Sequence, residues 1–163
     1  MLILLPPSES KTGRPRGRSL DLTRLSLPGL TNARAAAMAA VGAASARADA
    51  AALLGVSPNL TEEIARNTRL TTAPSVPVAD LYTGVLYDAL DLASLDAAAR
   101  RRASRRILVI SALFGALRLT DRVPPYRLSM AVNLPGTGPL AGHWRQPLAA
   151  ELPGQVGRGL VID

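Results

Sequence analysis

Two uninterrupted runs of apolar residues are the clearest pattern along the chain. They cover residues 1–5 and residues 107–110, and the first runs directly into Pro6-Pro7. Short apolar runs bounded by helix- or strand-breaking residues are typical of strands covered on both faces, and prolines cannot continue a central ladder because they lack an N–H. We therefore predict neighbouring strands near residues 1–5 and 107–111, and a third strand near residues 128–132.

Helical patterns separate these runs. An alanine-rich segment from Thr31 to Leu54 has high helix propensity, and Gly42 and Asp49 mark a possible break in it. Further helices are expected over residues 85–90, over residues 92–106 with Ser94 or Asp96 as cap, and from His143 towards Leu152. This order predicts a mixed α/β (α+β) fold of one domain, residues 1–163, with a central mixed sheet and flanking helices.

Residues 45–70 predict two helices joined by a tight turn. Gly55 is placed to end the first helix, and Glu62 and Glu63 fall in the first turn of the second. This pattern is similar to a helix-hairpin-helix element, in which backbone N–H groups bind a DNA phosphate; its candidate residues are Gly55, Ser57, Arg66 and Arg69. An ordinary helical corner is the alternative, because a second hairpin glycine is replaced by Ser57 and the two glutamates repel phosphate.

The charge balance changes the picture of possible partners. The net charge is +7, from eighteen arginines and one lysine against twelve acidic residues, which favours nucleic acid or small anions. The chain has no cysteine, so disulfides, thiolate nucleophiles and cysteine metal sites are excluded, and aromatic residues at 3% disfavour a stacking platform for single strands. The sequence shows no signal peptide and no membrane-spanning run, so we expect a cytoplasmic protein with no membrane partner.

The single lysine, Lys11, lies in the loop after the first predicted strand. In open α/β sheets ligands bind outside the carboxyl ends of strands, and lysine, unlike arginine, can lose its proton. Lys11 therefore becomes the principal candidate residue, although an arginine-biased chain must carry its one lysine somewhere. The neighbouring candidates for anion binding are Ser8, Ser10, Thr12, Arg14 and Arg16.

Several other motifs do not carry a function. Lys11-Thr12 has no preceding glycine-rich loop, which excludes a P-loop. The pattern Ser8-x-x-Lys11 matches a penicillin-recognising signature, but the second lysine and the Ser-Asp-Asn motif of those enzymes are missing. His143 is the only histidine, so we predict no metal site and no cofactor.

Five arginines fall within residues 100–106. Cations at the C-terminal end of a helix interact favourably with the helix dipole, so a solvated helix end explains them. Phosphate contact is the alternative.

Four motifs together resemble the peroxide-stress protein YaaA family, in the same order and spacing over nearly the whole chain. They are MLILLPPSESKT at residues 1–12, DLYTG at 80–84, SALFGALRLTD at 111–121 and PYRLSM at 125–130. The resemblance implies a mixed α/β fold with a basic cleft, a helix-hairpin-helix-like element, affinity for double-stranded DNA and a role in limiting oxidative damage. Members of the family continue beyond the position of Asp163, so we expect the domain to lack its C-terminal part.

Two functional hypotheses follow. The first is a peroxide-stress protein whose basic cleft binds double-stranded DNA largely without sequence specificity. The alternative is an enzyme acting on a small anionic substrate at the strand-end site, with Lys11, Glu9 and Asp121 as catalytic candidates. The remaining residues expected to contact the nucleic acid or anion are Tyr82, Gly84, Arg122, Tyr126 and Arg127.

Overall fold

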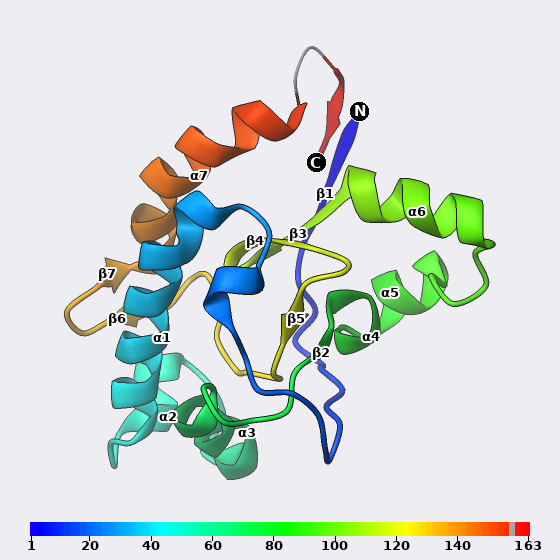
Figure 1. Cartoon of the computed structure of the whole chain (residues 1–163). Coiled ribbons are helices and arrows are strands. Elements are labelled where there is room, and N and C mark those ends of the chain that lie inside the picture. Colours follow the sequence, from blue (N-terminus) through cyan, green and yellow to red (C-terminus); the bar gives the residue numbers. More distant parts are fainter. Residues whose placement is uncertain (157–158) are drawn as a thin grey trace.

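A four-stranded mixed sheet forms the centre of the computed structural model, which describes residues 1–156 and 159–163 (Figure 1). Its strand order is β4-β3-β1-β8. The two predicted strands are neighbours, since β1 (Leu2–Leu5) runs parallel to β3 (Ile107–Ser111) with Ile3 opposite Ile107. On the outer sides, β8 (Val161–Ile162) pairs parallel with β1, and β4 (Gly115–Arg118) pairs antiparallel with β3.

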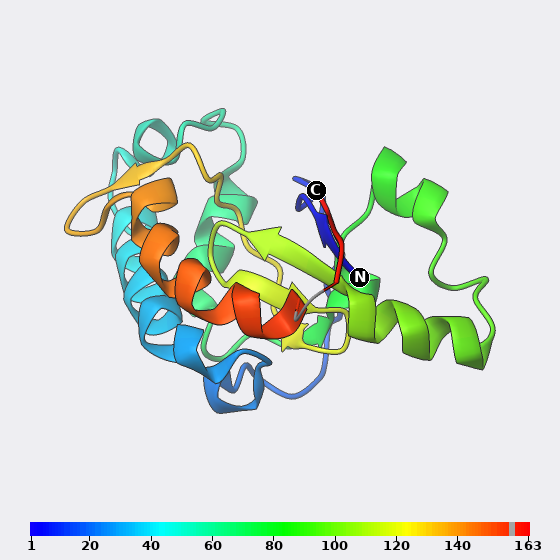
Figure 2. The same ribbon diagram turned by 90° about the horizontal axis from the view of Figure 1, so that it is seen from above.

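Helices flank the sheet on two sides. Figures 1 and 2 both place α1 and α7 on one side and α5 and α6 on the other. The helices are α1 (Thr31–Ser45), α2 (Ala50–Leu54), α3 (Thr61–Arg66), α4 (Val78–Leu81), α5 (Val85–Leu90), α6 (Ala97–Arg106) and α7 (Leu140–Val156), with 3-10 turns η1 (Leu22–Arg24), η2 (Pro28–Leu30) and η3 (Asn67–Arg69). Two small antiparallel pairs complete the fold, β2 (Val76–Pro77) with β5 (Arg122–Val123) and β6 (Asn133–Leu134) with β7 (Gly138–Pro139).

The core lies where α1, α7 and the sheet meet. Leu108, Leu113, Phe114 and Leu117 are fully buried there, together with Trp144 of α7, whose indole N–H donates to the carbonyl of Ala112 at 2.8 Å. β1 is less covered than its apolar run predicted, because only Leu2 is buried and Ile3 to Leu5 are half-buried.

Most predicted helix boundaries are confirmed. The alanine-rich segment breaks between Ser45 and Ala50, close to the predicted break, and Gly55 ends α2 in a left-handed conformation with φ 62°. Asp96 caps α6 by accepting the N–H of Ala99 at 2.7 Å. α7 is longer than expected and contains two prolines, Pro147 and Pro153.

The predicted strand at residues 128–132 is wrong. Leu128 and Val132 are buried, but the backbone makes no ladder there and turns at residues 130–131. Just before this segment, the Asn67 side chain binds the backbone of Arg127. It accepts the N–H of Arg127 at 2.9 Å and donates to the carbonyl of Arg127 at 2.8 Å. The apolar side chains of this segment are therefore buried without sheet pairing, and the nearest strand is the short β6.

No helix among the described residues is long and apolar enough to cross a membrane. The same part of the chain contains no cluster of three or more acidic, histidine or cysteine side chains suited to a metal ion.

Candidate functional site

The loop after β1 is fixed against the segment that follows α4. Lys11 and Tyr82 form an isolated antiparallel bridge, in which Thr12 N–H donates to Leu81 carbonyl at 2.8 Å and Thr83 N–H donates to Ser10 carbonyl at 3.2 Å. The prolines at positions 6 and 7 end the strand and free the next residues for this second pairing. Because β1 and β3 are parallel, the loop lies at the same edge of the sheet as the end of β3.

The Lys11 ammonium is held between carbonyl oxygens and tyrosine rings. It donates to the carbonyls of Ser8 at 2.7 Å and Glu9 at 3.3 Å, and it lies 4.4 Å from the ring centroid of Tyr126 and 5.4 Å from that of Tyr82. Carbonyl oxygens and ring faces both stabilise a cation at such distances. An ammonium has three N–H groups, so one remains for a ligand once the two carbonyls are bound.

The pKa of Lys11 is lowered from its ordinary value of 10.5 to about 8. Burial is the largest cause; the neighbouring Arg127 cation also lowers the pKa, and the Glu9 carboxylate partly opposes them by raising it. A lysine with this pKa is neutral in roughly one molecule in ten at pH 7, compared with far fewer for an exposed lysine. The side chain is therefore suited both to binding an anion and to accepting a proton.

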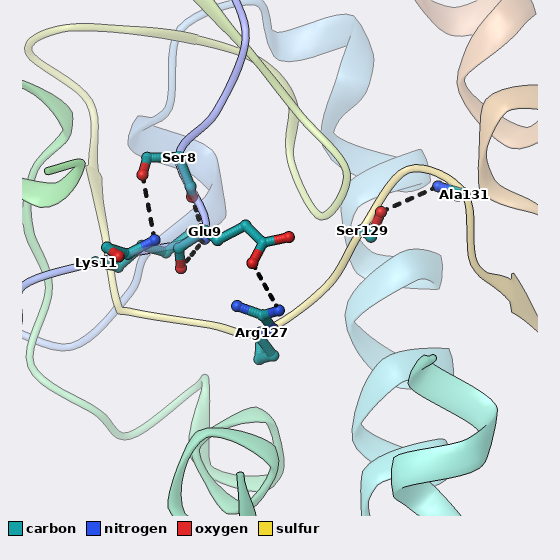
Figure 3. A network of polar contacts seen from close by, with 7 residues as sticks. Ser8, Glu9, Lys11, Arg127, Ser129 and Ala131 are labelled. Carbon is teal, nitrogen blue, oxygen red and sulfur yellow. Dashed lines mark hydrogen bonds and ion pairs between the residues drawn. The ribbon is translucent and has the colours of Figure 1, made fainter. Parts of the chain in front are cut away.

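Glu9 of the loop after β1 forms an ion pair with Arg127, which lies far away along the chain (Figure 3). The Arg127 guanidinium donates to Oε2 of Glu9 at 3.0 Å; the Glu9 side chain is 81% exposed and that of Arg127 21% exposed. An ion pair with one partner in water contributes little to stability. An incoming anion can therefore replace the Glu9 carboxylate on Arg127 at small cost.

Three hydroxyl groups form a buried chain below Lys11. Ser111 Oγ accepts the N–H groups of Leu113 at 3.2 Å and Phe114 at 3.0 Å, which use both of its acceptor positions. Ser111 must therefore donate its own hydrogen to Tyr126 Oη, 2.7 Å away, and Tyr126 Oη lies 2.9 Å from Tyr82 Oη. The hydroxyls of Ser111, Tyr126 and Tyr82 carry three hydrogens but form only two hydrogen bonds with one another. The hydroxyl hydrogen of one tyrosine is therefore available to another acceptor. Burial raises the pKa of both tyrosines, which keeps them protonated as donors.

Four cationic residues line one hollow beside this loop. Lys11 and Arg14 come from the loop, and Arg66 and Arg69 come from α3 and η3. The hollow has a volume of about 540 Å³, and no carboxylate is among its lining residues, which also include Gly13, Pro15, Thr72, Ala73, Pro74 and Pro125. We call it the Lys11 hollow.

The structure has two helices joined by a turn, α2 and α3, where two were predicted, but the turn is internally bonded. The N–H groups of Gly55 and Val56 donate to carbonyls of α2, and Ser57 Oγ accepts the N–H of Asn59 at 3.3 Å. Gly55 and Ser57 are exposed and do not line the Lys11 hollow. Arg66 of α3 and Arg69 of η3, and not the hairpin turn, are therefore the residues of this region that lie beside Lys11.

The other predicted site residues divide into two groups. Tyr82, Tyr126 and Arg127 surround Lys11, and Gly84 lies against the Ser8 hydroxyl, which accepts the N–H of Ser10 at 3.2 Å. Thr12 contributes its backbone, and Arg16 is exposed on the following loop.

Asp121 and Arg122 do not lie beside Lys11. They line a different hollow, together with Arg18. The Asp121 carboxylate is buried and accepts the N–H groups of Ser26 at 2.9 Å and Arg118 at 2.8 Å and the Ser26 hydroxyl at 2.8 Å. Arg122 donates to the Ser75 carbonyl at 2.9 Å. These contacts bind chain segments together and leave Asp121 without a position at Lys11.

Sequence reasoning missed Ser111, which fixes the direction of the hydroxyl chain. The signal was present, because Ser111 is the last residue of the second apolar strand and the same strand-end rule selected residues 8–12.

The profile of the family described as peroxide stress protein YaaA matches residues 1–163. The chain belongs to this family. It is 55% identical over 165 residues to a UPF0246 protein of Streptomyces coelicolor, covering 100% of this chain and 64% of that protein. It is 43% identical over 158 residues to a UPF0246 protein of Corynebacterium efficiens, covering 94% of this chain and 62% of that protein. The chain thus spans less than two thirds of the length of these relatives.

Proposed function

We propose that this YaaA-family protein binds double-stranded DNA through the Lys11 hollow, largely without sequence specificity, in the response to peroxide stress. The observation that carries the proposal is the convergence of Lys11, Arg14, Arg66 and Arg69 on one hollow with no carboxylate in its lining. Cations that neutralise phosphates release counterions, which gives affinity that depends on salt and not on base sequence.

The ion pairs around this hollow are weak enough to be exchanged for phosphates. Arg14 pairs with Asp80 at 3.2 Å, and both side chains are more than half exposed. Exposed pairs of this kind contribute less than about 1 kcal/mol to stability. Arg66 and Arg69 are exposed and take part in none of the ion pairs found among the described residues.

The test is the affinity for a fluorescent duplex across a salt series, using the full-length protein. Replacing both helix arginines, Arg66→Gln and Arg69→Gln, is expected to reduce the magnitude of the log-log salt slope by about 1.8, or 0.9 for each phosphate that the variant no longer neutralises. Lys11→Ala is expected to reduce it by about 0.9.

A matched control removes two charges elsewhere. Arg47 pairs with Asp49 at 2.7 Å and Arg145 is exposed on α7, and neither lines the Lys11 hollow. Equal slopes for R47Q/R145Q and R66Q/R69Q would show that only net charge matters and would contradict the proposed site.

A second function, catalysis on a small anionic substrate, is favoured by the environment of Lys11. Its remaining N–H, the unused tyrosine hydrogen and Arg127 supply donors for an oxyanion, and its pKa of about 8 suits proton transfer near neutral pH. Glu9 is the second candidate, as the carboxylate that an anionic substrate displaces from Arg127.

Acylation of the Lys11 amine as a function of pH tests this alternative. Modification is followed on the peptide that contains Lys11, and its rate is expected to reach half its maximum near pH 8. Half-maximal modification near pH 10.5 would remove the basis for proton transfer by Lys11, while leaving phosphate binding intact.

A further inference from the structure

A second cationic hollow lies along α6. Three arginines of this helix, Arg100, Arg101 and Arg105, line it together with Arg118 of β4. Its volume is about 870 Å³, and its other lining residues, Ala97, Ser104 and Thr120, add two hydroxyl groups and no carboxylate. We call it the α6 hollow.

Two of its arginines are held in place. The Arg118 guanidinium donates to the carbonyl of Arg105 and to Gln155 Oε1, the latter at 2.6 Å. Arg100 donates to the carbonyls of Leu92 and Ala93, both at 3.2 Å. Side chains that are already ordered lose less conformational entropy when a ligand binds.

The helix itself gains little from these charges. The helix dipole favours Arg105 and Arg106 in the last turn, but Arg100 and Arg101 lie earlier. Arg101 and Arg105 are an i,i+4 pair of like charge, which destabilises a helix by a few tenths of a kcal/mol. None of the ion pairs among the described residues includes an arginine of α6. An anionic partner that neutralises these charges accounts for the arrangement.

We propose that the α6 hollow is a second phosphate-binding surface for duplex DNA, separate from the Lys11 hollow. The inference rests on the proposed function, and it adds a contact surface to it. The two hollows share no lining residue, and both views place α6 and α3 at separate ends of the molecule (Figures 1 and 2). Cβ atoms at i,i+4 positions lie about 5–6 Å apart, so the guanidinium groups of Arg101 and Arg105 can bind oxygens of one phosphate.

The same helix offers a matched control. Arg102 and Arg106 are also exposed and also spaced i,i+4, but they do not line the α6 hollow. We compare R101Q/R105Q with R102Q/R106Q in the full-length protein, by duplex affinity across a salt series and by circular dichroism to confirm folding. R101Q/R105Q is expected to reduce the magnitude of the salt slope by about 1.8, and R102Q/R106Q by much less.

The outcomes separate this inference from the proposed function. Equal slopes for the two α6 variants, with the effect of R66Q/R69Q preserved, would overturn the second surface alone. An effect of R101Q/R105Q without one of R66Q/R69Q would overturn the role of the Lys11 hollow and support the α6 hollow. Binding that does not depend on salt in the unmodified protein would overturn both.

Discussion

At the scale of single residues, Lys11 couples protonation to folding. Its pKa is about 8 in the folded protein against an ordinary 10.5, so between these values the unfolded chain binds more protons. The free energy of unfolding is therefore expected to rise with pH across this window, by at most about 1.4 kcal/mol per pH unit. Burial raises the pKa of Tyr82 and Tyr126, so above pH ~10 the unfolded chain loses tyrosine protons first and stability falls.

Urea unfolding at pH 7.5, 8.5 and 9.5 measures this dependence. Lys11→Met keeps the length of the side chain without its charge, and it is expected to abolish the rise between pH 8 and 10. A rise that persists in the Lys11→Met variant would show that another group titrates in this range.

Individual site residues could be predicted only where position along a strand was informative. The strand-end rule selected Lys11, and the structure brings Tyr82 and Tyr126 beside it from later segments of the chain. The sequence also made Asp121 a catalytic candidate. It does not show that the Asp121 carboxylate already accepts the N–H groups of Ser26 and Arg118. Whether a polar residue is available depends on contacts between distant segments.

At the scale of secondary-structure elements, the turn between β3 and β4 packs closely against α7. Gly115 has φ 72°, and a Cβ there would lie 2.7 Å from Cζ3 and 2.8 Å from Cε3 of Trp144. Gly115→Ala is therefore expected to lower the free energy of unfolding by about 2 kcal/mol or more, from backbone strain and overpacking together.

Gly136 separates these two causes. Its φ is 79°, but a Cβ there meets no atom within 4 Å, so Gly136→Ala carries the backbone strain alone, at about 1 kcal/mol. Chemical denaturation of both variants gives the difference. Equal losses would mean that the Trp144 ring moves away without cost.

Elements were predictable where their ends carry local signals. Gly55 and Asp96 end and begin helices by their own backbone and side-chain chemistry, which a sequence displays. The segment at residues 128–132 has no such signal. Asn67 binds the N–H and the carbonyl of Arg127 from sixty residues earlier in the chain, and the backbone then turns at residues 130–131.

At the scale of the whole molecule, one arginine acts inside the core while most of the others lie at the surface. Arg34 of α1 is fully buried and donates to the carbonyls of Phe114 at 3.0 Å, Ala116 at 2.8 Å and Leu27 at 3.3 Å. It thus joins α1 to the edge strand β4 and to the turn before it. Burial lowers the pKa of this guanidinium, which is otherwise supported by the charges of Asp121 and Glu151.

Arg34→Met tests whether this charge serves folding and not binding. The substitution removes the Arg34 donor from the carbonyls of Phe114 and Ala116, whereas the Leu27 carbonyl keeps the N–H of Leu30 at 3.1 Å. Unsatisfied buried groups cost about 1–3 kcal/mol each, so the free energy of unfolding is expected to fall by at least about 2 kcal/mol. Arg47→Met removes the same charge from the surface, where its ion pair is exposed, and is expected to change the free energy of unfolding far less. Both variants are expected to keep the salt slope of DNA binding measured on folded protein, because neither residue lines a cationic hollow. A reduced slope for Arg34→Met alone would mean that α1 and the sheet position the phosphate-binding arginines, and that stability and binding are coupled through this residue.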